Sequence, residues 1–282
     1  MSTRILTQED PELEPYKEAI SKYTDVYEML GMSYWVFVDD SPFGLVAVGK
    51  EPVQLFAPLG TPLSMIRILD FEHPTETLKN FSQKALAISE ENEVEYASIS
   101  IPSKYEEVID LFRVLGFQVL ADTHWMVRQL DGAFEPSGAL SFEKVQRGEA
   151  GQFLELTREF MSGSPDSVLN IVLENLLEVP EEFRGLWYDR ERLYYAREDG
   201  ETVGILDLNL NEGAISNIGV APRHRGKGYG RQIMLFALRT LKEEGLEKAG
   251  LRVHVDNKPA MHLYETLGFG VKEQNSTLIW RK

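Results

Sequence analysis

The chain has 282 residues, 43% of them hydrophobic and 26% charged, a composition typical of globular proteins with room for one large domain or two ordinary ones. It contains no cysteine, which excludes disulfides, thiolate metal sites and a cysteine nucleophile. The net charge of −16 disfavours nucleic acid and anionic membranes as partners, because their phosphates would be repelled. The start, MSTRILTQED, lacks the apolar core of a signal peptide, and no long apolar run follows. We therefore expect a cytoplasmic protein. We further expect a monomer or a homodimer.

An internal repeat organises the chain. Leu115-Gly116-Phe117 recurs 152 residues later as Leu267-Gly268-Phe269, and at the same offset the alternating pattern of residues 97–101 recurs at 249–253. Further upstream the offset is 160, so the first copy carries eight extra residues near Lys50 to Gly60. The sequence predicts a duplicated domain, with copies over 1–133 and 134–282 joined by the turn-rich stretch 131–138.

The second copy alternates between strand and helix patterns. In chain order we expect a strand over 140–145, helices over 148–160 and 167–179, and a hairpin of strands 193–197 and 202–210 around Asp199-Gly200. A turn at 211–213 leads to a strand over 214–220, a helix over 230–244, a strand over 249–255, a helix over 259–267 and a strand over 277–280. Hairpins combined with strand–helix–strand units predict a mixed sheet and an α+β fold.

A basic glycine-rich loop lies between the strand 214–220 and the next helix. It reads Arg225-Gly226-Lys227-Gly228-Tyr229-Gly230. Glycines let a backbone approach an anion closely, the N–H groups at a helix N-terminus point at it, and Arg225 and Lys227 add positive charge. The pattern is neither a P-loop nor the dinucleotide-binding G-x-G-x-x-G. It predicts a bound pyrophosphate, with an exposed basic turn as the alternative.

A second block runs from Val253 to Phe269. A strand ends there at Asn257, which can cap the following helix. Tyr264, within that helix, is placed to turn its hydroxyl toward the strand ends, although a tyrosine at such a position is more often a packed aromatic.

Together the two blocks resemble the GNAT superfamily of N-acetyltransferases. The loop is similar to its Q/R-x-x-G-x-G/A acyl-CoA loop and follows Ile218-Gly219-Val220-Ala221-Pro222, while the second block is similar to N-x-x-A-x-x-L-Y-x-x-L-G-F. The resemblance covers residues 140–282 closely and the first copy in outline. It implies two tandem GNAT-like domains, each a mixed, mostly antiparallel twisted sheet flanked by helices.

The resemblance also implies roles for the matched residues. Residues 225–230 would bind the pyrophosphate of acetyl-CoA, the acyl-donor substrate, with no metal involved. The strand edge at Ile218 and Val220 would pair with the pantetheine amides, and one of these N–H groups would polarise the thioester carbonyl. Asn257 would hold the pantetheine arm, and Tyr264 would protonate the departing thiolate. A small-molecule amine would attack the thioester directly, and the acidic surface favours a cationic one.

The general base remains open. Many relatives carry a carboxylate early on the strand before the loop, where this sequence has Ala214. Three candidates remain: Glu212, Asp207 and His254. Without a catalytic role they would be a turn carboxylate, a solvated group at a strand edge and a packed histidine, respectively.

The first copy lacks the corresponding chemistry. His73 to Leu78 aligns with the loop but has no glycine, and it contains Pro74, without an N–H, and Glu76, which repels phosphate. Phe112 aligns with Tyr264, and Tyr105 with Asn257. We expect a degenerate domain that shapes the acceptor site or takes part in pairing. The alternative function is a non-catalytic acyl-CoA-binding sensor or scaffold whose N-terminal domain binds a partner.

Overall fold

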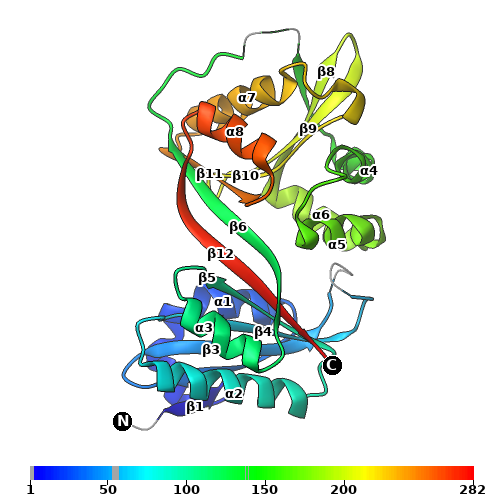
Figure 1. The fold of residues 1–282 in the computed structure, drawn as a ribbon. Coiled ribbons are helices and arrows are strands. Elements are labelled where there is room, and N and C mark those ends of the chain that lie inside the picture. Colours follow the sequence, from blue (N-terminus) through cyan, green and yellow to red (C-terminus); the bar gives the residue numbers. More distant parts are fainter. Residues whose placement is uncertain (1–2, 53–56, 137, 139) are drawn as a thin grey trace. The chain divides into compact units, whose positions relative to one another are not determined.

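The computed structural model describes residues 3–52, 57–136, 138 and 140–282. It divides into two compact units, the first formed by Met1–Asp122 with Asn275–Lys282 and the second by Thr123–Gln274 (Figure 1). These units differ from the copies expected over 1–133 and 134–282. Two long strands, β6 (Gln118–Gln129) and β12 (Gly270–Arg281), each start in one unit and end in the other. A strand of twelve residues extends about 40 Å, roughly twice the usual length, so each of these two strands contributes residues to both units of one continuous sheet.

The first unit is a mixed sheet with helices on both faces. Its strand order is β1-β2-β3-β4-β5-β12, and of the neighbouring pairs only β4 with β5 is parallel in the described residues. The strands besides β12 are β1 (Arg4–Thr7), β2 (Ser33–Val38), β3 (Pro42–Lys50), β4 (Pro62–Ile68) and β5 (Tyr96–Pro102). The 3-10 helix η1 (Pro11–Tyr16) leads into α1 (Lys17–Met29), which packs on one face, while α2 (Thr75–Glu91) and α3 (Glu106–Val114) pack on the other. The extra residues expected near Lys50 to Gly60 fall between β3 and β4, where residues 53–56 lie outside the described residues.

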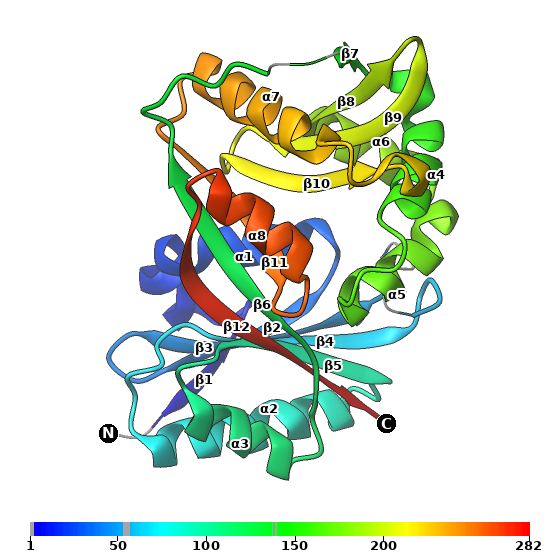
Figure 2. The same cartoon turned by 45° about the horizontal axis from the view of Figure 1, so that its top comes forward.

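The second unit repeats this plan. Its strand order is β6-β11-β10-β9-β8-β7, with β7 (Ser141–Lys144), β8 (Glu191–Glu198), β9 (Glu201–Asn209), β10 (Ala214–Val220) and β11 (Lys248–His254). Helices α7 (Tyr229–Glu243) and α8 (Lys258–Thr266) pack on the sheet face that carries Leu206 and Leu208. Helices α4 (Ala150–Phe160) and α6 (Glu181–Arg190) pack on the face that carries Leu193 and Ile205 (Figure 2). The unit also contains α5 (Ser167–Asn175) and the 3-10 helices η2 (Arg147–Glu149), η3 (Leu176–Glu178) and η4 (Pro222–His224).

The repeat found in the sequence recurs in the element boundaries. β5 and β11, α3 and α8, and β6 and β12 begin and end 152 residues apart. The hairpin expected at Asp199-Gly200 is present, with φ of +48° and +85° at these residues, as a tight turn between β8 and β9 requires. The predicted fold class, two tandem mixed α/β domains, is confirmed.

Two elements differ from the sequence-based expectation. Helix α6 was not expected, since EEFRGLWYDR shows no clear helical period of apolar residues. Strand β12 begins at Gly270 and not near Thr277. The sequence did not indicate its first part, because the first five residues are exposed and lack the alternation that marks a half-buried strand. No helix in the described part of the chain is both long enough and apolar enough to cross a membrane.

Candidate functional site

Strands β10 and β11 diverge near the middle of the second unit's sheet. They are parallel and paired at Ala214 with Gly250 and Ile215 with Leu251, although they continue to Val220 and His254. On its other edge β10 stays paired with β9 as far as Val220. Both strands lie wholly within the described residues. From Ser216 onward, the edge of β10 that faces β11 therefore has backbone N–H and C=O groups that are not paired with β11. Ile218 and Val220 lie on this stretch.

The glycine-rich loop connects the end of β10, through η4, to α7. Gly226 and Gly228 have φ of +79° and +82°, a conformation that glycine adopts without strain. A Cβ placed at either residue would meet no atom within 4 Å, so the loop is open on that side. Gly228 is the N-cap of α7, and the first N–H groups of a helix have no partner within it. The loop thus has the conformation and the donors that suit a phosphate-bearing ligand.

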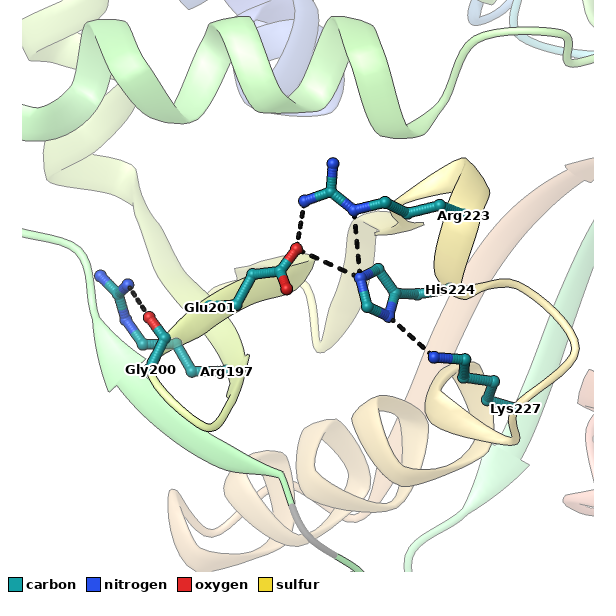
Figure 3. Close-up of polar contacts among 6 residues, drawn as sticks. All are labelled: Arg197, Gly200, Glu201, Arg223, His224 and Lys227. Carbon is teal, nitrogen blue, oxygen red and sulfur yellow. Dashed lines mark hydrogen bonds and ion pairs between the residues drawn. The ribbon is translucent and has the colours of Figure 1, made fainter.

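The basic side chains around the loop are held by protein groups. The Arg225 guanidinium donates hydrogen bonds to the carbonyl oxygens of Phe160, at 2.8 Å, and Ser162, at 3.3 Å, at the end of α4. Glu201 accepts from Arg223 and lies 3.2 Å from His224 Nε2, and Lys227 Nζ lies 3.3 Å from His224 Nδ1 (Figure 3). The hydrogen bond from Arg223 lowers the pKa of Glu201. Arg225 therefore anchors α4, so what the loop itself presents is mainly its backbone N–H groups.

Tyr229 and Gly230 begin α7 and fix its position. A hydrogen bond with Glu198 raises the pKa of Tyr229 to about 12. A Cβ at Gly230 would lie 3.3 Å from Leu263 Cδ2, so only glycine lets α7 approach α8 this closely without displacing Leu263. The close approach places the start of α7 beside the turn of α8 that carries Tyr264.

Tyr264 lies in α8, and Asn257 precedes this helix as its N-cap. Burial raises the pKa of Tyr264 to about 12, so its phenol keeps its proton at neutral pH. Its ring packs in the core with Phe269, at 6.1 Å between ring centroids. The Asn257 side-chain oxygen accepts a hydrogen bond from Ala260 N at 3.3 Å, which makes it the helix cap that the sequence predicted.

The three candidate bases have different surroundings. Glu212 is exposed in the turn before β10. His254 is packed, with a 10% exposed side chain whose Nδ1 accepts from Asp256 N at 3.2 Å. Asp207 is completely buried, so the expectation of a solvated strand-edge group is wrong. It lies on β9, an interior strand between β8 and β10, on the face covered by α4 and α6.

Asp207 is paired with a second carboxyl group that sequence analysis missed. Its Oδ2 accepts from Asn217 Nδ2 at 2.8 Å, while its Oδ1 is buried with no hydrogen-bond partner among the described residues, and Glu191 is close enough to act on its charge. Burial, followed by the negative charge of Glu191, raises the pKa of Asp207 well above its usual range. Glu191 accepts from Asn209 Nδ2 at 2.9 Å and from Ser216 Oγ at 3.3 Å. Glu191 belongs to no local motif, and only the pairing of β8 with β9 brings it near Asp207.

The chain resembles known proteins most clearly in this unit. Residues 164–269 match the family model of the acetyltransferase (GNAT) family. A mycothiol acetyltransferase from Thermomonospora curvata is 36% identical over 86 residues, and one from Streptomyces avermitilis over 91. These segments cover 29% and 31% of this chain, and they span only 29% and 30% of the relatives' length. A mycothiol acetyltransferase from Acidimicrobium ferrooxidans is 26% identical over 64% of this chain and 61% of its own length.

Solved structures share the fold over nearly the whole chain. A GCN5-related N-acetyltransferase from Sphaerobacter thermophilus gives a TM-score of 0.68 at 15% identity, covering 99% of this chain and 95% of its own. A tandem GNAT protein from the clavulanic acid biosynthesis pathway gives 0.62 at 12% identity, covering 99% and 98%. The chain therefore has a tandem GNAT fold and carries a domain of the GNAT acetyltransferase family in its second unit.

Proposed function

We propose that the second unit transfers an acetyl group from acetyl-CoA to a small-molecule amine, with Tyr264 as the general acid. The observation that carries this proposal is the loop at residues 225–230. Gly226 and Gly228, both at positive φ, leave the N-terminus of α7 open. The loop follows β10, which is not paired with β11 beyond Ile215. A pyrophosphate and an extended amide-bearing arm need these two features side by side.

Each matched residue then has a defined task. The N–H groups of Gly226, Gly228 and their neighbours bind the pyrophosphate, and the β10 edge at Ile218 and Val220 pairs with the pantetheine amides. A β10 N–H polarises the thioester carbonyl. Asn257, whose side-chain oxygen caps α8, offers its amide N–H₂ to the pantetheine arm. Tyr264 remains protonated at neutral pH and gives its proton to the thiolate as the carbon–sulfur bond breaks.

The acceptor is proposed only as a class. A net charge of −16 attracts cations, so a cationic amine is favoured. The two mycothiol acetyltransferases with 36% identity align over 29% and 30% of their length, and the one from Acidimicrobium ferrooxidans over 61% at 26% identity, so their acceptor is not carried over to this chain. We propose the cytoplasm as the place of action, since acetyl-CoA is available there.

The direct test is thiol release from acetyl-CoA in the presence of cationic, neutral and anionic amines. Amine-dependent release, with acetylated amine as the product, supports the enzyme, and preference for an anionic amine contradicts the cationic acceptor. Tight CoA binding with no release for any amine would instead favour the non-catalytic acyl-CoA sensor.

The proton donor is tested by Tyr264→Phe. The variant should bind acetyl-CoA with nearly unchanged affinity, while turnover falls about 10- to 10⁴-fold, as for the loss of a general acid. Tyr194→Phe is a suitable control, since Tyr194 lies in the same unit, is half-buried and also has a pKa raised by burial. Unchanged turnover in Tyr264→Phe, with chemistry rate-limiting, would exclude this role.

A further inference from the structure

A β-bulge on β10 turns two consecutive side chains toward the same face of the sheet. The register between β10 and β9 shifts between Ile215 and Asn217. Ile215 packs in the core under α7, whereas Ser216 and Asn217 both bond to carboxyl groups on the opposite face, Glu191 and Asp207. Bulges re-aim side chains in this way and are frequent beside active sites. This bulge lies where β10 leaves β11.

Two carboxyl groups lie beside this bulge, Asp207 deep in the fold and Glu191 nearer the surface. Asp207 is completely buried, and the groups that face it are Glu191, Asn217 and the Trp187 side chain of α6. Glu191 is only partly buried, and its partner Ser216 is exposed, so solvent or a substrate can reach the pair from the Glu191 side. Burial, and after it the charge of Glu191, raise the pKa of Asp207 well above its usual range, so the buried carboxyl group favours its protonated form.

Tyr264 lies on the other side of the sheet from this pair. It belongs to the core under α7 and α8, whereas Asp207 and Glu191 lie on the face of α4 and α6. Beyond Ile215, β10 is not paired with β11, so a thioester bound along this edge of β10 would be open to groups from both faces of the sheet. An acid on one face and a base on the other match a reaction in which an amine approaches from one side and a thiolate leaves toward the other.

We propose that Glu191 is the general base that takes the proton of the acceptor amine, and that Asp207, buried beside it on the neighbouring strand, positions it. β10 itself, AISNIGV, contains no carboxylate that could do this. Glu191 is also held by hydrogen bonds from Asn209 and from Ser216 on the bulge. The inference rests on the acetyl transfer proposed above.

The proton balance of the step is complete. The ammonium group of the acceptor gives one proton to Glu191, and the neutral amine attacks the thioester carbon. The carbon–nitrogen bond forms, the carbon–sulfur bond breaks, and Tyr264 gives its proton to the sulfur. The second proton lost by nitrogen returns to Tyr264 through solvent, and Glu191 releases its proton to solvent. The products are the amide, CoA as a thiol, and one proton.

The test compares Glu191→Gln with Glu191→Asp and Glu143→Gln in the full chain. With an amine that is protonated at the assay pH, Glu191→Gln should lower kcat/KM about 10²- to 10⁴-fold while CoA affinity, measured by titration, stays unchanged. Glu191→Asp keeps the charge and should retain more activity than Glu191→Gln. Glu143→Gln removes an exposed carboxylate of β7 that pairs with Arg197 and should act like the wild type.

A second acceptor separates a base from a merely structural carboxylate. A fluorinated analogue of the best amine has a lower ammonium pKa and is already neutral at the assay pH. With this analogue, the loss of kcat/KM caused by Glu191→Gln should be at least about tenfold smaller. An equal loss with both amines, or a loss of CoA binding, would show a structural role and overturn the inference. The inference would also be overturned if Glu191→Gln were fully active and Glu212→Gln were inactive. If the wild type acetylates no amine, the proposed function fails and this inference falls with it.

Discussion

At the scale of single residues, Asp207 is the least expected feature. A carboxyl group on an interior strand is normally excluded from a core, because its charged form loses its hydration there. Its retention beside Glu191 means that this site sacrifices stability, which proteins do mainly where the group has a function.

We predict that Asp207→Asn stabilises the protein at neutral pH. The folded protein holds the Asp207 proton at a raised pKa, whereas the unfolded chain releases it near pH 3.8. The contribution of Asp207 to stability is therefore fully present below about pH 4 and is lost as pH rises toward the raised pKa. Asparagine cannot ionise, so the variant should match the wild type near pH 4 and exceed it progressively above. Each unit of pKa shift corresponds to about 1.4 kcal/mol.

Denaturant unfolding of both proteins between pH 4 and pH 8 measures this difference. A variant that is less stable than the wild type at every pH would show that Asp207 is ionised in the fold and that its hydrogen bonds outweigh its burial. A constant difference across the range would show that the carboxyl does not titrate there.

The residues that sequence alone identified differ from those it missed in a physical way. Tyr264 and Asn257 lie seven positions apart on one helix and its cap, so local spacing places them. Glu191 and Asp207 are sixteen positions apart on neighbouring strands, and the hairpin register brings them together. Whether Asp207 is buried or solvated depended on α4 and α6, which no pattern around residue 207 indicates.

At the scale of elements, the loop before α7 could be predicted because glycine at positive φ is a local requirement. The strand–loop–helix order, the hairpin turn and the ends of β10 all followed from local patterns. The full extent of β12 and the existence of α6 did not, since polar exposed residues form them and pairing or packing holds them.

We predict that Gly228→Asp weakens CoA binding by at least about 2 kcal/mol, or roughly thirtyfold in Kd. The new side chain places a Cβ and a negative charge at the N-terminus of α7, where the pyrophosphate should lie. Gly245→Asp is a matched control, because Gly245 follows the other end of α7 with φ of +84° and equally open surroundings. It carries the same left-handed strain and the same charge. Titration calorimetry showing wild-type affinity in a folded Gly228→Asp variant, or equal weakening in both variants, would refute the loop assignment.

At the scale of the whole molecule, the chain contains the same fold twice. The two copies differ at the start of the helix that follows β4 in the first unit and β10 in the second. In the second unit, α7 begins at a glycine with open space beside it. In the first unit, α2 begins after Pro74, which has no N–H to donate, and Glu76 lies in its first turn. His73, just before, lies 3.1 Å from Asp70 and 3.9 Å from Asp39, so carboxylates already surround the one basic side chain at that position.

These differences predict that each chain binds one acyl-CoA. We expect the second unit to offer a pyrophosphate several charge-assisted hydrogen bonds, each contributing about 1.5–3 kcal/mol, whereas in the first unit Pro74 has no N–H to donate and nearby carboxylates add like charge. Loss of several such bonds should remove specific binding from the first unit, although its sheet keeps buried residues such as Ile66 and Ile99. Calorimetric titration of active protein with CoA should give a stoichiometry near one, and Gly228→Asp should abolish that binding and not merely halve it. A stoichiometry of two, or tight binding that persists in Gly228→Asp, would mean that the first unit has kept an acyl-CoA site.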